Sequence, residues 1–280
     1  MKICTTINEV RAASRAAQQS QKSLGLVPTM GALHEGHLSL VRAAKARCDS
    51  VVSTIFVNPT QFGPSEDFAK YPRMFEQDCE ALEKEGVDLL FAPSVEEMYP
   101  AGATTFVTVE GLSERLCGKS RPGHFRGVTT IVSKLFNIVE PDAAFFGQKD
   151  AAQIAIIRRM VRDLNIPVEI VPCPIVREPD GLAMSSRNAY LDLQQRRVAL
   201  VLHRSLMQVE ELFRNGEDVS GKLIDEGKQI FQQEPSVRLD YFEIVDPNTL
   251  KPVPQVQKPA LVAVAAFLGS TRLIDNVVLI

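Results

Sequence analysis

The chain has no excess of positive charge, and this limits the partners it is built to bind. Its 31 basic and 34 acidic residues leave a formal net charge of −3. A surface for nucleic acid needs Lys and Arg in excess over one face, so nucleic acid is not expected as a partner. A hydrophobic share of 45% and a charged share of 23% predict a globular protein with a buried core.

The chain also lacks the cysteine patterns of disulfide-rich and zinc-binding proteins. Its five cysteines are scattered and odd in number, with no CxxC pair, which fits a reducing cytosol. The first residues have neither the apolar core nor the small-residue cleavage site of a signal peptide. No apolar run approaches the roughly 18 residues that cross a bilayer. We therefore expect a cytoplasmic protein that has no membrane partner.

Apolar runs that alternate with amphipathic segments predict the fold of residues 1–174. Strands are expected at 24–29, 50–57, 87–92, 104–109, 142–146 and 168–172, and helices at 36–49, 74–85, 127–139 and 151–165. Strands and helices in this alternation form parallel sheets. The prediction is an α/β fold, a Rossmann-like, doubly wound parallel sheet whose ligands bind beyond the carboxyl ends of the strands.

The pattern changes after residue 174, where the proline-rich segment VPCPIVREPDG predicts a junction. Two helices are expected at 194–215 and 219–233, followed by strands at 238–245, 260–267 and 272–279. Strands joined by turns favour antiparallel pairing. We predict a smaller C-terminal α+β domain at 175–280 that carries a short antiparallel sheet.

The stretch VPTMGALHEGHLSL, residues 27–40, joins a predicted strand to a predicted helix. A zinc-protease pair needs histidines at i and i+4, whereas His34 and His37 are three residues apart with no obvious third ligand, which argues against a metal. Two interpretations remain. The histidines cap the helix, or they donate hydrogen bonds to a phosphate that Gly31, Gly36 and the free helix N–H groups allow to approach closely.

Two more polar segments predict contacts with a nucleotide. In FFGQKDAAQ, Lys149 is either a surface lysine or a phosphate ligand, and Asp150 is a helix cap, a ribose contact or a Mg²⁺ ligand. The run MSSR at 184–187 is either a helix cap with an exposed Arg187 or a mobile loop that closes on a triphosphate.

Two further loops predict a polar acid beside the nucleotide. In NPTQFG, Asn58 and Gln61 suit the orientation of a hydroxy acid, although Asn-Pro also forms simple turns. The basic segment 118–127 is either a solvated loop or an electropositive wall. Together the loops indicate a site for a triphosphate and a small polar acid.

These motifs resemble those of the HxGH nucleotidyltransferase superfamily. The sequence HEGH at 34–37 matches its HIGH-type motif, and MSSR at 184–187 is similar to a shortened KMSKS-type loop. The longer segments PTMGALHEGHLSL, FVNPTQFGPSEDFAKYPR, FFGQKDAAQ and REPDGLAMSSRNAYL are similar, in this order, to segments of the pantothenate synthetase family. This resemblance extends over essentially the whole chain.

The resemblance implies a Mg²⁺-dependent ligase that uses ATP to join (R)-pantoate to β-alanine. ATP and pantoate would give pantoyl adenylate and pyrophosphate, and β-alanine would then displace AMP to form pantothenate. It also implies a homodimer that associates through the N-terminal domain, which binds ATP and pantoate, and a C-terminal domain that acts as a lid.

The resemblance also implies site residues, motif by motif. The catalytic residues would be His37, His34, Lys149 and Arg187. The ATP site would comprise Met30, Gly31, Ala32, Leu33, His34, Glu35, Gly36, His37, Gly147, Gln148, Lys149, Asp150, Val176, Met184, Ser185, Ser186 and Arg187. Pantoate would contact Gln61, Gln153 and Asn58, with Gln61 also at the β-alanine position and Tyr71 in the same pocket. Asp150 is the expected protein contact of Mg²⁺, while Asp78 and Arg126 receive no role.

Two alternative functions remain open on the residues alone. One is a nucleotidylyltransferase that passes AMP to a phosphate acceptor, which the NPTQFG and YPR segments and the C-terminal domain weigh against. The other is a non-catalytic nucleotide-binding module, which the intact set of chemically active side chains disfavours. A tRNA-charging role is disfavoured because neither an anticodon-binding domain nor a basic surface is evident.

Overall fold

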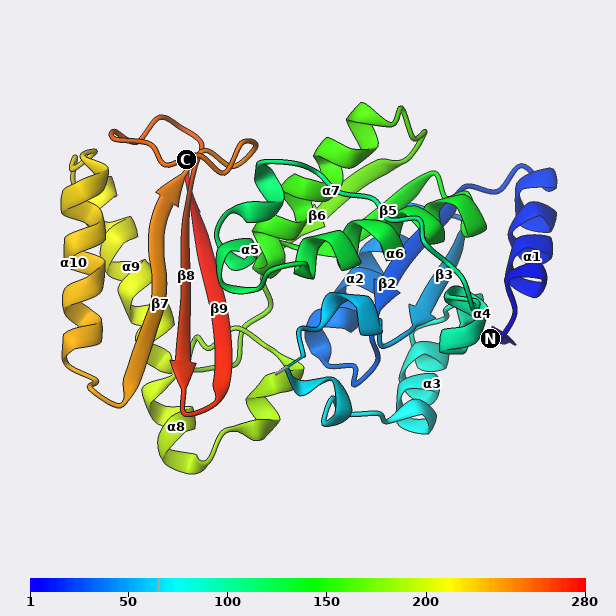
Figure 1. Cartoon of the computed structure of the whole chain (residues 1–280), viewed down its shortest axis with the longest axis horizontal. Helices are drawn as coiled ribbons and strands as arrows, with labels where there is room; N and C mark the ends of the chain where they lie inside the picture. Colours follow the sequence, from blue (N-terminus) through cyan, green and yellow to red (C-terminus); the bar gives the residue numbers. More distant parts are fainter. Residues whose placement is uncertain (65) are drawn as a thin grey trace.

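The computed structural model describes residues 1–64 and 66–280 and contains two sheets that lie side by side (Figure 1). All strand pairs of the larger sheet are parallel, and its strand order is β1-β4-β3-β2-β5-β6. The strands are β1 (Lys2–Cys4), β2 (Leu24–Thr29), β3 (Ser50–Ile55), β4 (Leu89–Phe91), β5 (Ala143–Gly147) and β6 (Glu169–Cys173). The predicted parallel α/β sheet is confirmed.

The strand order reverses between β2 and β5. From β2 the chain moves outward through β3 and β4, and it later returns to add β5 and β6 on the other side of β2. The loops that leave the carboxyl ends of β2 and β5 therefore diverge. In open α/β sheets a crevice forms at this point and binds ligands.

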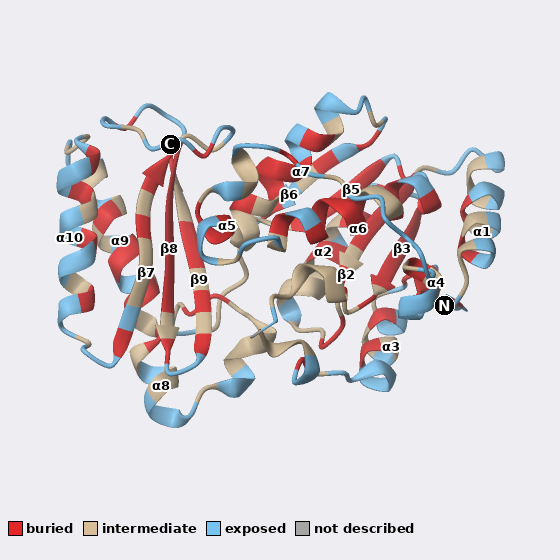
Figure 2. Cartoon of the chain, viewed as in Figure 1, coloured by how far each residue is buried: buried red, intermediate tan, exposed pale blue. Residues whose placement is uncertain are grey.

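Helices cover both faces of the larger sheet. They are α1 (Ile7–Gln19), α2 (Glu35–Lys45), α3 (Phe75–Lys84), α4 (Val95–Met98), α5 (Cys117–Ser120), α6 (His124–Val139) and α7 (Ala151–Asp163). One apolar cluster contains buried residues of α1, α6 and α7, and a separate cluster contains those of α2 and α3. Figure 2 shows the buried residues gathered in the strands and on the inner faces of these helices.

The prediction of a strand at 104–109 is wrong, because this segment joins neither sheet. It lies against α6 instead. Thr130 Oγ1 accepts a hydrogen bond from Val107 N at 3.0 Å, and Thr129 Oγ1 donates one to Val107 O at 2.6 Å. Weak apolar alternation fits any extended segment with one buried side, so it did not distinguish a strand from a chain packed on a helix. The elements β1, α1, α4 and α5 lie outside the predicted set.

The C-terminal part forms the predicted antiparallel sheet. Its elements are α8 (Leu193–Val198), α9 (Leu200–Arg214), α10 (Ser220–Gln232), β7 (Val237–Val245), β8 (Ala260–Leu268) and β9 (Thr271–Leu279). The single helix predicted at 194–215 is two helices that meet at Ala199. This residue keeps helical dihedral angles of −56° and −25°, so the apolar spacing continues across the break. Among the described residues, no helix is long and apolar enough to cross a bilayer.

The two sheets share apolar packing. Val245, Leu261 and Ala263 of the smaller sheet belong to the same cluster as buried residues of α6 and α7. The opposite face of the smaller sheet packs on α9 and α10. The domain boundary at residue 174 stays a prediction, since the apolar core is continuous across it.

A close backbone contact fixes α6 against the short helix η1 (Pro59–Gln61). A Cβ atom on Gly127 would lie 2.3 Å from Thr60 O and 2.6 Å from the Gln61 Cα. Only glycine allows this approach. The helix therefore sets the position of the loop that carries Asn58 and Gln61.

The substitution Gly127→Ala is expected to destabilise the fold. The added methyl meets rigid backbone atoms, and overpacking of this kind costs about 1–3 kcal/mol. Urea unfolding should show this loss in the free energy of unfolding.

Gly221→Ala is the matched control, because nothing lies within 4 Å of its added methyl. In the first turn of α10 this change should be neutral or stabilise by up to ~1 kcal/mol. Equal unfolding free energies for Gly127→Ala and the unchanged chain would contradict the packing described for α6.

Candidate active site

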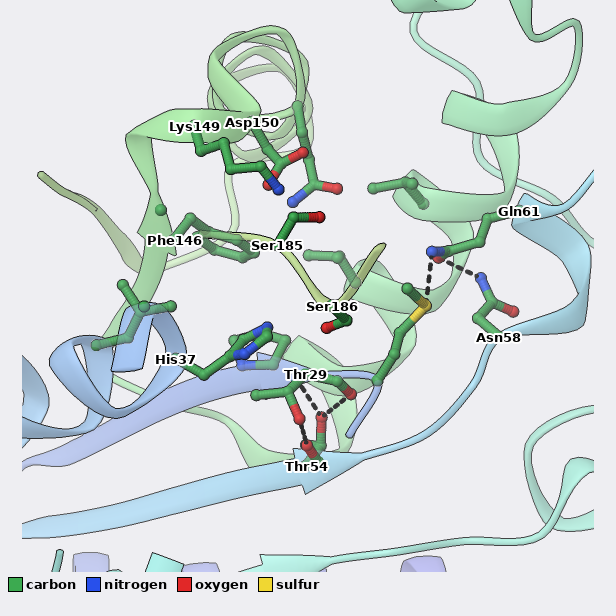
Figure 3. Close-up of a pocket in the computed structure, with 18 of the residues that line it drawn as sticks. Thr29, His37, Thr54, Asn58, Gln61, Phe146, Lys149, Asp150, Ser185 and Ser186 are labelled. Carbon is green, nitrogen blue, oxygen red and sulfur yellow. Dashed lines mark hydrogen bonds between the residues drawn. The ribbon is translucent and has the colours of Figure 1, made fainter. Parts of the chain in front are cut away.

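A pocket of about 230 Å³ lies at the carboxyl ends of β2 and β5, where the strand order reverses (Figure 3). It brings together predicted site residues from four separate loops. Those that line it are Met30, His34, Gly36, His37, Asn58, Gln61, Tyr71, Gly147, Lys149, Asp150, Gln153, Val176, Met184, Ser185, Ser186 and Arg187. Five residues of the predicted ATP site are not among the lining residues: Gly31, Ala32, Leu33, Glu35 and Gln148.

The turn after β2 is strained and is held by a buried carboxylate. Gly31 and Ala32 have φ angles of +78° and +49°, a region that is unfavourable for alanine. Asp78 on α3 accepts hydrogen bonds from Ala32 N at 2.9 Å and from Leu33 N at 2.8 Å. A Cβ atom on Gly31 would lie 2.9 Å from the Asp78 Oδ2, so glycine is required by the carboxylate as well as by φ.

Asp78 thus has a clear structural role that the sequence did not assign. It is 3% exposed, and burial raises the pKa of its carboxyl group although the two N–H donors act in the opposite direction. A signal was present in the sequence. Asp78 lies one helical turn before the buried Leu82, so it sits on the apolar face of α3, where an acidic residue needs a partner.

The two histidines cap α2, as one of the two interpretations predicted. His34 Nδ1 accepts a hydrogen bond from Gly36 N at 3.1 Å, and His37 Nδ1 accepts one from His34 N at 3.3 Å. An Nδ1 that accepts a hydrogen bond carries no proton. In a neutral imidazole the proton is then on Nε2, so each ring keeps one N–H donor that the cap does not use.

The capping geometry corrects the expected role of the helix N–H groups. Gly36 N donates to the His34 ring and His37 N donates to His34 O, so neither group is free for a phosphate. Position 36 requires glycine, because a Cβ atom there would lie 2.8 Å from the ring of His34. The imidazole N–H groups of His34 and His37 are hydrogen-bond donors that the cap leaves for an anion.

Burial keeps both imidazoles neutral. It lowers the pKa of His34 to about 4, with the Lys149 cation as the next cause, and the pKa of His37 to about 3, where His34 and Lys149 add to the effect. The ring centroids are 4.2 Å apart, so charging one ring would oppose charging the other. The pocket therefore presents neutral donors at pH 7, with Lys149 as a neighbouring positive charge.

Asn58 orients the carboxamide of Gln61. Its Oδ1 accepts hydrogen bonds from Tyr99 OH at 2.8 Å and Thr60 Oγ1 at 2.9 Å. Its Nδ2 donates to Gln61 Oε1 and to Gly127 O, both at 3.1 Å. Because Gln61 uses its oxygen in this contact, its Nε2 faces the pocket, where it lies 2.9 Å from Met30 Sδ. Tyr99 is a further member of the site that the sequence did not indicate.

The segment Met184–Arg187 lies over the turn after β2. Ser186 Oγ donates a hydrogen bond to Ala32 O at 3.1 Å. Arg187 forms a bidentate ion pair with Asp67, with both N–O distances at 2.9 Å. The alternative of an exposed helix cap holds only in part. Ser185 does cap the short helix Ser186–Tyr190, but Arg187 lies inside the pocket wall.

The basic segment 118–127 contributes two residues to the pocket wall. Arg121 pairs with Glu66 through two contacts of 2.7 Å, and its Nη1 lies 3.0 Å from His124 Nε2. Burial, followed by the charge of Arg121, lowers the pKa of His124 to about 3. Arg126 lies outside the pocket, exposed, with its guanidinium 3.8 Å from the centre of the Phe106 ring.

Lys149 and Asp150 point into the pocket from the opposite side to His37 (Figure 3). Asp150 makes no capping hydrogen bond to α7, so its carboxylate is directed at the cavity and not at the helix. Within residues 1–64 and 66–280, no cluster of three His, Cys, Asp or Glu side chains could hold a metal. A single carboxylate fits Mg²⁺ that is held mainly by phosphate oxygens.

Comparison with known proteins identifies the family. The family model for pantoate-beta-alanine ligase matches residues 2–278. The chain belongs to this family. It is 62% identical to the pantothenate synthetase of Koribacter versatilis over 279 residues, covering 100% of this chain and 96% of the relative. It is 57% identical to that of Thermotoga petrophila, covering 100% of both chains.

Solved structures of pantothenate synthetases have the same fold. The crystal structure of the Thermus thermophilus enzyme matches with a TM-score of 0.94 and 47% identity over 99% of both chains. That of the Francisella tularensis pantoate-beta-alanine ligase, complexed with beta-gamma ATP and beta-alanine, matches with a TM-score of 0.82 and 34% identity, over 99% of this chain and 97% of that one. The predicted activity is confirmed: the protein is an ATP-dependent ligase that condenses pantoate with β-alanine.

The depressed histidine pKa values predict a loss of stability in mild acid. The unfolded chain protonates each imidazole near pH 6.5, while the folded chain holds His37 neutral down to about pH 3. Stability from this residue is therefore complete above pH 6.5 and falls as the pH falls. Urea unfolding measures the free energy of unfolding at pH 7 and at pH 5. Between these two values, His37→Asn should lose less of this free energy than the unchanged enzyme, by up to about 2 kcal/mol.

Asparagine can keep the cap, because its Oδ1 replaces Nδ1 as the acceptor. Carboxylates affect the unchanged enzyme and the variant alike. The difference between their slopes of unfolding free energy against pH therefore gives the contribution of His37 alone. Identical slopes for His37→Asn and the unchanged enzyme would show that His37 is not held neutral by the fold.

Proposed function

We propose that this pocket activates pantoate as its adenylate before β-alanine enters the reaction. A carboxylate oxygen of pantoate attacks the α-phosphorus of ATP, and pyrophosphate leaves with the electron pair of the broken P–O bond. The amine of β-alanine then attacks the acyl carbon, loses a proton to solvent, and displaces AMP to give pantothenate. The carboxylate needs this step because it has no good leaving group of its own.

One observation carries the proposal: two neutral imidazole donors and Lys149 face the same cavity as Gln61 and Gln153. In-line attack at phosphorus needs positioning and charge stabilisation more than proton transfer. Neutral N–H donors and a fixed cation supply both. The resemblance to the family supports the same assignment of His34, His37, Lys149 and Arg187 to the phosphates.

On the nucleotide side, we propose that Met184–Arg187 closes over ATP and that Asp150 would hold the Mg²⁺ that accompanies its phosphates. Asp150 fits the metal because its carboxylate faces the pocket without a capping partner. Mg²⁺ bound there would neutralise phosphate charge. Arg187 is paired with Asp67, so the phosphates would either share the Arg187 guanidinium with this carboxylate or displace the carboxylate from it.

On the acid side, we propose that pantoate lies between Gln61 and Gln153. The hydrogen bond from Asn58 supports Gln61 as a donor to a carboxylate or hydroxyl oxygen. Both N–H groups of Asn58 are used within the protein, so we propose that Asn58 acts on pantoate through Gln61. The same face of Gln61 would meet β-alanine in the second step.

Two further proposals concern the cellular location and the oligomeric state of the enzyme. All five cysteine thiols are free, which supports a reducing cytoplasm. The family resemblance supports a homodimer that associates through residues 1–174. Light scattering on the purified protein should then give twice the mass of the chain, and a mass equal to one chain would exclude the dimer.

The reaction is tested with ATP, Mg²⁺, D-pantoate and β-alanine, following AMP and pantothenate. The proposed route predicts equal amounts of both products, and pyrophosphate release that depends on pantoate before β-alanine is added. Inorganic phosphate and ADP in place of AMP and pyrophosphate would exclude the adenylate route. A stable dinucleotide would identify a nucleotidylyltransferase.

His37→Ala separates the two half-reactions. Loss of a donor to the phosphates should slow adenylate formation by about 100-fold or more, since such donors contribute about 2.7–4 kcal/mol to transition states. Attack of β-alanine on supplied pantoyl adenylate should change much less. Single-turnover assays of each step give both rates, and equal losses in the two steps would oppose the phosphate role.

Tyr99→Phe tests the orientation of Gln61. The variant removes one of the two hydroxyl donors to Asn58 Oδ1 and so weakens the contacts that orient the amide pair. Loss of one net hydrogen bond of about 1 kcal/mol predicts a KM for pantoate raised about five-fold. The KM for ATP should stay unchanged. A rise in both KM values, or in neither, would oppose a specific role in pantoate binding.

A further inference from the structure

Two adjacent residues of β9 are polar and almost fully buried. Asp275 is 2% exposed and Asn276 is 3% exposed. Successive side chains of a strand point to opposite faces of its sheet. On β9, Leu273 and Val277 face the core that contains α9 and α10, whereas Ile274 and Val278 face the core of the larger sheet. The side chains of the consecutive residues Asp275 and Asn276 therefore project from opposite faces of the smaller sheet.

Asn276 points at the turn that carries Lys149 and Asp150. Its Nδ2 donates hydrogen bonds to Gln148 O and Lys149 O, both at 2.9 Å. Its Oδ1 lies 3.4 Å from the Gln148 Nε2. The carboxamide thus satisfies two consecutive carbonyl groups of the short helix Gln148–Asp150, from the other end of the sequence. A buried carbonyl without a donor is costly, so this contact fixes the path of the turn.

Asp275 acts on the second nucleotide loop. Its carboxylate forms a bidentate ion pair with Arg177, at 2.6 and 2.9 Å. Arg177 also donates to Gly181 O at 3.0 Å, and its backbone bridges to Ala183. Asp275 therefore supports the base of the segment that continues into Ser185 and Arg187. Hydrogen bonds between charged partners of this kind are stronger than neutral ones.

We infer that Asp275 and Asn276 are positioning residues for ATP binding, which together hold both nucleotide loops from the C-terminal sheet. The inference rests on the proposed function of Lys149, Asp150 and Met184–Arg187. It gives the C-terminal part a specific task besides lining the pocket. The smaller sheet sets the register of the Lys149 turn against the Arg187 loop, so that both reach the same triphosphate.

A merely structural contact between the two sheets makes a different prediction from a positioning contact. Truncation of a structural contact lowers thermal stability and leaves ligand affinity alone. Truncation of Asn276 should instead weaken ATP binding selectively, because the two carbonyl groups lie next to Lys149 and Asp150. The neighbour Val277 offers the matched control, because it packs on the opposite face of the same strand.

The experiment measures binding of a non-hydrolysable ATP analogue with Mg²⁺ by calorimetry, together with thermal unfolding and KM values of the full chain. Asn276→Ala should weaken analogue binding about ten-fold, equivalent to about 1.4 kcal/mol. Asn276→Asp keeps the size but has no N–H donor and adds negative charge, so it should weaken binding further. The KM for pantoate should change by less than about two-fold in both variants.

The control and the unchanged enzyme make the outcomes distinct. Val277→Ala should lower the unfolding temperature and leave analogue affinity unchanged. Wild-type affinity in both Asn276 variants, or an equal loss in Val277→Ala, would overturn the positioning role. If the unchanged enzyme itself binds no analogue and forms no AMP, the proposed function fails instead.

Asp275→Asn tests the second half of the inference by hydrogen exchange. The neutral amide loses the bidentate ion pair with Arg177, so amide exchange in residues 181–187 should become faster, while exchange in α10 stays unchanged. Unaltered exchange in residues 181–187 would show that Asp275 does not support this loop.

Discussion

The site depends on one constraint, which is that the backbone N–H groups of the turn between β2 and α2 need acceptors. Asp78 supplies two oxygens to Ala32 and Leu33, and the imidazole rings of His34 and His37 supply the next two acceptors. Satisfying these donors holds the strained backbone at Gly31 and Ala32. It also leaves each ring with a proton on the nitrogen that faces away from the cap.

This arrangement explains why a cap and a functional site occupy the same four residues. An aspartate would cap α2 equally well but would leave no donor for an anion, because an ionised carboxylate only accepts hydrogen bonds. A histidine uses one ring nitrogen as the acceptor in the cap and keeps the other as a donor. Burial holds the rings neutral, so the positive charge of the pocket comes from Lys149, Arg121 and Arg187. A polyanion therefore meets donors that remain in place at every pH near 7.

Local patterns in the sequence predicted the strands on both sides of the crevice and the loops that leave them. They did not predict partners that are distant in sequence. Asp78 was recognisable only as an acidic residue on an apolar helix face, and Tyr99 and Asn276 carry no local signal, because their roles arise from packing of segments 41 to 128 residues away. For the same reason, the sequence does not show that Gly31 makes room for Asp78 and Gly36 for the ring of His34.

Both functions of the histidines, the cap and the donation to an anion, require neutral rings that are protonated on Nε2. Nitrogen-15 NMR of the imidazole side chains in the ligand-free enzyme measures this directly. At pH 7, His34 and His37 should each show a protonated Nε2 and an unprotonated Nδ1, and this pattern should persist to about pH 5. A protonated Nδ1 on either ring at pH 7 would contradict this arrangement, since that nitrogen could not accept the hydrogen bond that caps α2.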